Sequence, residues 1–287
     1  IDPKLAGTTT ICTSVRGVLT NSTLNVRTLL VDKYKIQIED TNDLVHIYNE
    51  ESKESLRLEK KQLPEIEGIK LISIITTLCH FEKLKKIEEI ILNLFKNINI
   101  SPYQIKKDYE TISKIEQSKE KKISTTVAMS KETQEIFAFS KGNPKKILER
   151  CTRILINNKK VELTYQLRRK LRKKIQKLNQ HGEKVIAFAY KGLPFKRLNH
   201  YSEKFSENDM IFIGLIGLSE DPNLNLIPII EEAKKKNIKF YVLSHLRERE
   251  VMAAAIDLKV INPFYFESIT GSDLREFNEA KLMKLLS

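Results

Sequence analysis

The segment that ends at Ser14 carries the first side chains whose type and position could do chemistry. Residues 8–13 form an apolar and β-branched run, and a turn with Gly17 follows. A strand of this kind delivers the next side chain to the carboxyl edge of a parallel sheet, where α/β proteins place their chemistry. Ser14 holds that position. Its hydroxyl could accept a transferred group only with a base beside it, and neither Val15 nor Arg16 is one.

The segment Lys141-Gly142-Asn143-Pro144 is the second candidate. Gly142 predicts a tight turn, and Pro144 predicts the first residue of a helix. Exposed backbone amides at a helix start, together with the ammonium group of Lys141, would form a seat for an anion.

The elements around this second segment read as a mixture of strands and helices. Residues 71–95 repeat apolar side chains at helical spacing, whereas residues 43–63 are polar, poorly periodic and expected to include loop. Residues 163–178 predict an amphipathic helix with a narrow aliphatic stripe and a basic back, which favours core packing over membrane contact. A short helix or loop is expected over 101–115, and strands are expected over 24–31, 34–38, 123–129, 135–140, 154–156, 160–162 and 184–190.

The last third of the chain reads as alternating strands and helices. Strands are predicted at 210–218, 238–243 and 260–261, helices at 222–237, 248–258 and 278–286, and a loop at 270–272. This alternation favours parallel βαβ packing. Since the opening strand is more like this third than like the middle, we predict that the middle is inserted between them.

Composition and charge narrow the class of protein. The chain has 287 residues, is 41% hydrophobic and has a formal net charge of +13. It holds no apolar run near the roughly 20 residues that a membrane-spanning helix needs. Its three cysteines, Cys12, Cys79 and Cys151, are widely spaced, so neither a zinc site nor a disulfide partner is expected. The chain does not begin with Met, and we interpret it as a piece of a longer protein.

The positive charge allows two interpretations. It could attract nucleotide, anionic lipid or nucleic acid, or it could reflect solvated lysines on every helix. The lysine clusters are scattered and have no interleaved aromatic side chains, so no nucleic-acid partner is expected.

Four segments together resemble the P-type ion-transporting ATPases. The family pattern Ile-Cys-Thr/Ser-Asp-Lys-Thr-Gly-Thr-Leu-Thr contains the Asp that ATP phosphorylates, and the position of that Asp holds Ser14. Residues 118–125, 141–152 and 212–222 with 238–260 resemble further family segments in the same order. The first match is carried by Ile11, Cys12, Thr13, Gly17, Leu19 and Thr20.

The resemblance implies a fold and a division into domains. It implies an α/β chain in which part of a phosphorylation domain, of the Rossmann-like HAD class, holds a large inserted α+β nucleotide-binding domain. That inserted domain would be an antiparallel sheet flanked by helices. The implied boundaries are 1–25 and 208–287 for the phosphorylation domain and 26–207 for the insertion.

The resemblance also assigns roles to single residues. Lys121, Lys141, Gly142 and Lys184 match positions that line the nucleotide, while Glu116 stands where the family has an adenine-stacking Phe. Asp221 and Pro222 match the start of the Asp-Pro-Pro-Arg hinge. Ser244 stands where the family's Thr-Gly-Asp loop begins. The loop that binds Mg²⁺ should lie beyond Ser287, so we expect no metal site and consider Mg²⁺ binding unlikely from this chain alone.

These assignments imply the cytoplasmic headpiece of a degenerate cation-transporting ATPase. Because Ser14 replaces the carboxylate nucleophile, we expect no aspartyl-phosphate and at most weak binding of ATP. The chain itself would be soluble, at the cytoplasmic face of a membrane that flanking helices of a longer parent cross. The alternative is a regulatory module that docks on a partner or an anionic membrane through its basic face.

Overall fold

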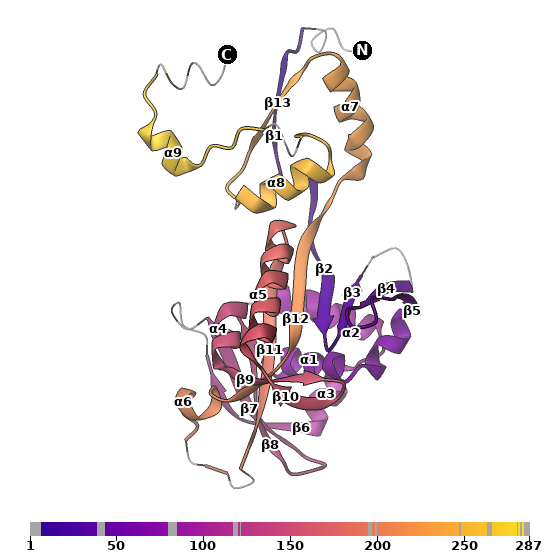
Figure 1. Cartoon of the computed structure of the whole chain (residues 1–287), viewed down its shortest axis with the longest axis vertical. Coiled ribbons are helices and arrows are strands. Elements are labelled where there is room, and N and C mark those ends of the chain that lie inside the picture. The colour runs from indigo at the N-terminus through magenta and orange to yellow at the C-terminus, as the bar shows by residue number, and fades with distance from the viewer. Residues whose placement is uncertain are drawn as a thin grey trace. The chain divides into compact units, whose positions relative to one another are not determined.

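The computed structural model describes residues 7–38, 44–79, 85–116, 120, 122–194, 197–198, 200–246, 248–262, 266–279, 281 and 283 (Figure 1). It divides into two compact units. The smaller unit comprises Ile1–Thr23, Gln180–Gly182 and Glu220–Ser287, and the larger comprises Leu24–Asn179 and Glu183–Ser219.

The larger unit is built on a sheet to which eleven of the described strands belong. Nine of them follow the order β5-β4-β3-β2-β12-β11-β8-β7-β6, and β9 joins the sheet through a parallel pairing with β12. Antiparallel pairing joins β2 to β3, β3 to β4, β4 to β5, β6 to β7, β7 to β8, β8 to β11, β11 to β12 and β9 to β10. The strands are β2 (Thr20–Val31), β3 (Tyr34–Gln37), β4 (Leu44–Asn49), β5 (Ser55–Glu59), β6 (Tyr109–Ile115), β7 (Ile123–Ser130), β8 (Ile136–Gly142), β9 (Cys151–Ile156), β10 (Lys159–Glu162), β11 (Lys184–Leu193) and β12 (Met210–Pro222).

Helices pack on both faces of this sheet. Along β11 the side chains alternate between two hydrophobic clusters, as a strand's period of two requires. Phe188 packs with residues of α1 and α2, whereas Ala187 packs with residues of α4 and α5. The helices are η1 (Lys60–Glu65), α1 (Glu67–Leu78), α2 (Lys85–Asn97), α3 (Pro102–Asp108), α4 (Pro144–Arg150), α5 (Tyr165–Gln180) and α6 (Glu203–Ser206). The prediction of an α/β chain with a large antiparallel sheet flanked by helices is confirmed.

The smaller unit contains a parallel pair of strands with helices beside it. β1 (Thr10–Ser14) pairs in parallel with β13 (Lys239–Leu243). Val15, Leu19, Ile230 and Leu258 contribute to its hydrophobic cluster. Its helices are η3 (Leu224–Leu226), α7 (Ile227–Lys235), α8 (Glu248–Asp257) and α9 (Gly271–Glu276).

The structure refines several local predictions in the larger unit. The loop expected within 43–63 is the turn over 50–54. It lies between β4 and β5, two strands that the sequence did not predict because alternating side chains such as Val45 and Ile47 bury only one face of a strand. The helical region 71–95 is two helices, α1 and α2. The stretch 101–115 is α3 followed by the strand β6.

Some predictions for the smaller unit also differ from the structure. Residues 260–261 are not a strand, since the amide of Val260 donates to the carbonyl of Ala255 and closes the end of α8. The expected loop at 270–272 opens α9, where Thr270 caps the helix. The strand predicted at 238–243 is present as β13, and its residues are exposed or half-buried. The helix expected at 278–286 lies largely outside the described residues.

Candidate functional site

The two strands of the smaller unit bring Ser14 and Ser244 to one edge. Ser14 is the last residue of β1 and lies in register with Leu243, the last residue of β13. Because the strands are parallel, their carboxyl ends coincide, and Ser244 follows immediately. The Ser14 hydroxyl donates to the carbonyl of Arg16 at 3.3 Å, and the Ser244 hydroxyl accepts from the amide of Leu246 at 3.1 Å.

Arg16, two residues after Ser14, belongs to a charged pair. The Arg16 guanidinium contacts the Glu220 carboxylate at 2.7 Å, and the Thr20 hydroxyl donates to the same carboxylate at 2.6 Å. Asp221 and Pro222, the predicted hinge residues, are the last two residues of β12. Glu220 therefore forms the ion pair of this segment. The sequence reading missed it, although Glu220 and Asp221 stand together as adjacent carboxylates.

In the larger unit Lys141 is buried and paired instead of exposed. Its side chain is 4% exposed and forms an ion pair with Glu88 of α2, which is 2% exposed. The expected exposed anion seat is therefore wrong for this side chain. Sequence reasoning missed Glu88, although it lies three residues before Ile91 on the buried stripe of α2, where a carboxylate needs a partner.

A buried thiol lies in the same environment. Cys79 follows α1 and donates from its Sγ to the carbonyl oxygen of Phe139 at 3.1 Å. Burial raises the pKa of the Cys79 thiol, and the positive charge of Lys141 opposes this rise. The hydroxyl of Thr126, in β7, donates to the carbonyl of Leu78, the last residue of α1, at 3.2 Å. These bonds connect the end of α1 to β7 and to β8, the strand that carries Lys141.

Gly142 ends a strand instead of forming the expected tight turn. It is the last residue of β8, and a Cβ added there would lie 2.3 Å from the carbonyl oxygen of Lys122. A glycine is required because the backbone of the neighbouring strand approaches so closely. Pro144 begins α4 as predicted, and the Asn143 side chain accepts from the amides of Lys145 and Lys146. The amides at this helix start are thus already bonded.

Lys184 is the first residue of β11, and its side chain lies on the same face of the sheet as that of Phe188, which pairs with Lys141 of β8. Phe188 lies in register with Lys141, and Lys184 is four residues earlier, about 13 Å along an extended strand. Ile186 lies between them and packs against the cluster that contains Phe188. Lys184 is exposed. Lys121, the remaining predicted nucleotide residue, lies outside the described residues.

Glu183, beside Lys184, is a half-buried carboxylate that the sequence analysis did not select. Its Oε1 accepts from the Thr28 hydroxyl at 3.1 Å, while its buried Oε2 has no hydrogen-bond partner within the described structure. Burial raises the pKa of Glu183, and Thr28, Lys35 and Arg27 act in the opposite direction. Gly217 leaves room for it, since a Cβ there would lie 1.9 Å from Oε2.

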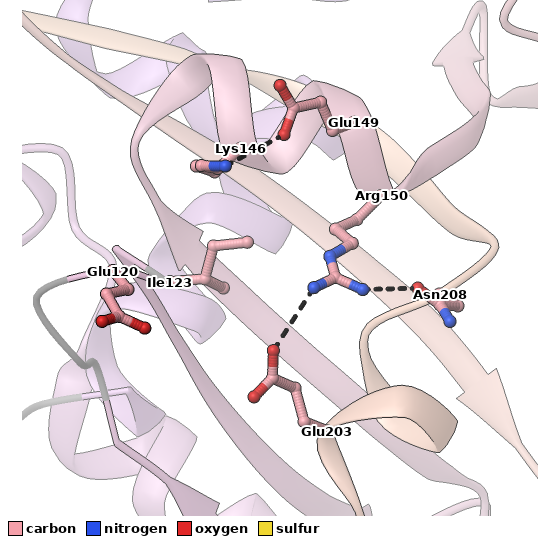
Figure 2. Close-up of a pocket in the computed structure, with 7 residues that line it drawn as sticks. All are labelled: Glu120, Ile123, Lys146, Glu149, Arg150, Glu203 and Asn208. Atoms are coloured by element: carbon pink, nitrogen blue, oxygen red, sulfur yellow. Dashed lines mark hydrogen bonds and ion pairs between the residues drawn. The ribbon is translucent and has the colours of Figure 1, made fainter.

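A pocket of about 560 Å³ lies near α4 and α6 (Figure 2). Lys146 pairs with Glu149 at 3.4 Å. Arg150 contacts both Glu203, at 3.3 Å, and Asn208, at 2.9 Å. Of the predicted nucleotide residues that the structure describes, none lines the pocket, and among the described lining residues three carboxylates face two cations. The lining residues are Glu120, Ile123, Lys146, Glu149, Arg150, Glu203 and Asn208. This balance does not favour a phosphate.

A comparison with known families decides the identity of the chain. The family model for the P-type ATPase cytoplasmic domain N matches residues 81–225, just over half of the chain. The chain belongs to the P-type ATPases. The matched range includes Lys141, Gly142 and Lys184, so these residues lie in the nucleotide-binding domain of that family.

Individual P-type ATPases are similar over different parts of the chain. A calcium-transporting ATPase of Lactococcus lactis is 29% identical over 148 residues, which is 52% of this chain and 16% of the relative. One from Listeria monocytogenes is 23% identical over 98% of this chain and 30% of the relative. A sodium/potassium-transporting ATPase alpha subunit of Artemia franciscana is 24% identical over 98% and 32%. The chain therefore spans less than a third of the length of these relatives.

Two properties of the described residues complete the description of the site. No helix among them is both long and apolar enough to cross a membrane. They also contain no group of three or more His, Cys, Asp or Glu side chains that could hold a metal ion. All three cysteines are free thiols.

Proposed function

We propose that this chain is the nucleotide-binding headpiece of a degenerate P-type cation-transporting ATPase that forms no aspartyl-phosphate. The observation that supports this most directly is the place of Ser14. It ends β1 beside the end of β13, and a hydroxyl there lacks the carboxylate that an acyl-phosphate requires. The smaller unit is then part of the HAD-like phosphorylation domain, and the larger unit is the inserted nucleotide-binding domain.

The nucleotide would extend along the start of β11. Lys184 lies about 13 Å along β11 from Phe188, the residue that pairs with Lys141. This separation suits a nucleoside triphosphate with its base near Gly142 and its phosphates near Lys184. Lys184 is exposed and cationic, which favours phosphate oxygens. Ile186 supplies apolar surface between the two ends.

Two features support weak rather than tight binding. Lysine presents a single ammonium, whereas an arginine would hold phosphate with two parallel N–H donors. Glu116, at the position of the family's stacking Phe, supplies a negative charge in place of an aromatic face. We expect Mg²⁺ to enter with the nucleotide or not at all, since the described residues offer it no carboxylate cluster.

The phosphorylation proposal is tested with ATP labelled at the γ-phosphate. The longest available parent chain is incubated with labelled Mg-ATP and precipitated in acid. We expect no protein-bound label that hydroxylamine releases, because Ser14 cannot form an acyl-phosphate. Hydroxylamine-sensitive label would overturn the proposal.

Nucleotide binding is tested separately with a fluorescent ATP analogue. Lys184→Glu should abolish the binding signal by placing a carboxylate among the phosphates, whereas Lys96→Glu, at an exposed site on α2, should leave it unchanged. Lys141 is unsuitable for this test, because changing it leaves Glu88 buried without its cation. Equal binding by all three proteins would place the nucleotide elsewhere.

A further inference from the structure

The exposed side of α5 carries cations and no carboxylate. The sequence of this helix, Tyr165–Gln180, contains no Asp or Glu. Its exposed cations, which we call the α5 basic face, are Arg169, Lys170, Arg172, Lys173 and Lys177. Among the described residues none of them is paired with a carboxylate. The face belongs entirely to the larger unit.

Like charges on this face stand at neighbouring positions of the helix. Arg169, Lys173 and Lys177 follow one another at intervals of four residues, a stripe about 12 Å long. Like charges three and four residues apart destabilise a helix. The helix therefore carries repulsion that an anionic partner would relieve.

Other helices of the chain carry carboxylates of their own among their cations, whereas α5 has none and, among the described residues, only Lys174, which lies outside the basic face, pairs with a carboxylate, that of Glu50. In α4 Lys146 pairs with Glu149, and just beyond α7 Lys236 pairs with Glu232. The excess of lysine in the whole chain does not by itself produce a helix face of one sign. This contrast separates α5 from a merely solvated basic surface.

The chemistry of the face favours a protein partner over a membrane. Leu171 and Leu178 are buried in the core, so the apolar stripe of α5 cannot insert into lipid. Gln166 and Gln176 are exposed among the cations and can bond to a peptide backbone. The planar guanidinium of Arg169 matches a carboxylate through two hydrogen bonds.

We propose that the α5 basic face docks an acidic protein segment, a run of Asp or Glu side chains. This surface is independent of the nucleotide proposal, because none of its residues is among those assigned to the nucleotide. Charge complementarity would set the rate and specificity of docking, and salt would weaken it.

The test measures binding of a fluorescein-labelled polyglutamate peptide by anisotropy. The variant Arg169→Gln/Lys173→Gln/Lys177→Gln removes the stripe with residues of similar helix propensity. The control Lys70→Gln/Lys96→Gln/Lys106→Gln removes the same charge from exposed sites on α1, α2 and α3. Circular dichroism checks that both variants remain folded.

We expect the stripe variant to bind about tenfold more weakly and the control variant to bind like the unchanged chain. Equal weakening in both variants would mean that net charge alone attracts the peptide, and would overturn the proposal. So would failure of the unchanged chain to bind polyglutamate. Tighter binding to vesicles of phosphatidylserine and phosphatidylcholine, or to DNA, lost only in the stripe variant, would instead assign the face to that partner.

Discussion

The two units hold their charged groups in opposite ways. In the larger unit Lys141 and Glu88 are buried together, and the half-buried Glu183 has one carboxylate oxygen bonded to Thr28 and the other buried without a partner among the described residues. In the smaller unit Arg16 contacts Glu220 while remaining 52% exposed. A buried ion pair fixes the position of both side chains, and removing one of them costs much of the protein's stability. An ion pair with an exposed partner contributes little to the free energy of unfolding. The larger unit thus has a buried charge pair that joins β8 to α2, and the smaller unit has a hydroxyl, not a carboxylate, at position 14.

The largest expected effect is the loss of one partner of the buried pair. Lys141→Met leaves Glu88 buried without a cation and should lower the free energy of unfolding by about 3–5 kcal/mol. Urea unfolding of the larger unit measures this. The double variant Lys141→Met/Glu88→Leu serves as the control and should recover most of the loss. A single variant as stable as the unchanged chain would contradict the buried pair.

The contact between Gly217 and Glu183 should give the next effect. Gly217→Ala places a Cβ where the Glu183 carboxylate lies and should destabilise the larger unit by about 1–3 kcal/mol. Thermal unfolding measures the loss, and Gly192→Ala, with no heavy atom within 4 Å of its added Cβ, is the matched control. Adding Glu183→Ala should remove part of the loss. Simple additivity of the two changes would show that they do not interact.

Glu183 should also make the stability of the larger unit depend on pH. Because burial raises its pKa, the folded protein binds the proton more tightly than the unfolded chain does. This contribution is present at low pH and is lost as the pH rises through the folded pKa. Glu183→Gln should flatten the fall in stability above pH 4.5, measured by urea unfolding across a pH series. Glu89→Gln, at an exposed site, should leave the slope unchanged.

The smallest effect is expected at the exposed pair of the smaller unit. Arg16→Ala should change its stability by less than about 1 kcal/mol, because Arg16 is 52% exposed and Thr20 still bonds to Glu220, whose side chain is 11% exposed. Hydrogen exchange of the β1 amides measures this. A loss as large as that at Lys141 would remove the contrast between the units.

Much of the fold could be predicted from the sequence, because the spacing of apolar side chains reflects which face of an element is buried. Side chains of β7 and β8 and the apolar stripe of α5 gave their elements directly. The strands β4 and β5 were missed because their exposed residues are polar and their buried ones few. The pattern of side chains in a single strand does not say which residue of a distant strand it pairs with. The sequence therefore could not show that Ser14 lies in register with Leu243.

The site was less predictable, because its key contacts join distant segments. Lys141 and Glu88 are 53 residues apart, and Glu220 is 200 residues from Thr20. A lysine at a strand end gives the same local pattern whether it is exposed or buried. Glu88 on the apolar stripe of α2 was the one available signal that a buried cation lies opposite.

The cap at Asn143 has an evolutionary consequence. Its side chain occupies the amides of Lys145 and Lys146, so that an incoming ligand meets a helix start with these donors already satisfied. Exchange of this single asparagine for a residue with a short aliphatic side chain would expose both donors at once. One codon thus separates a closed helix start from an open one, and drift at this codon could alter ligand recognition without repacking the fold.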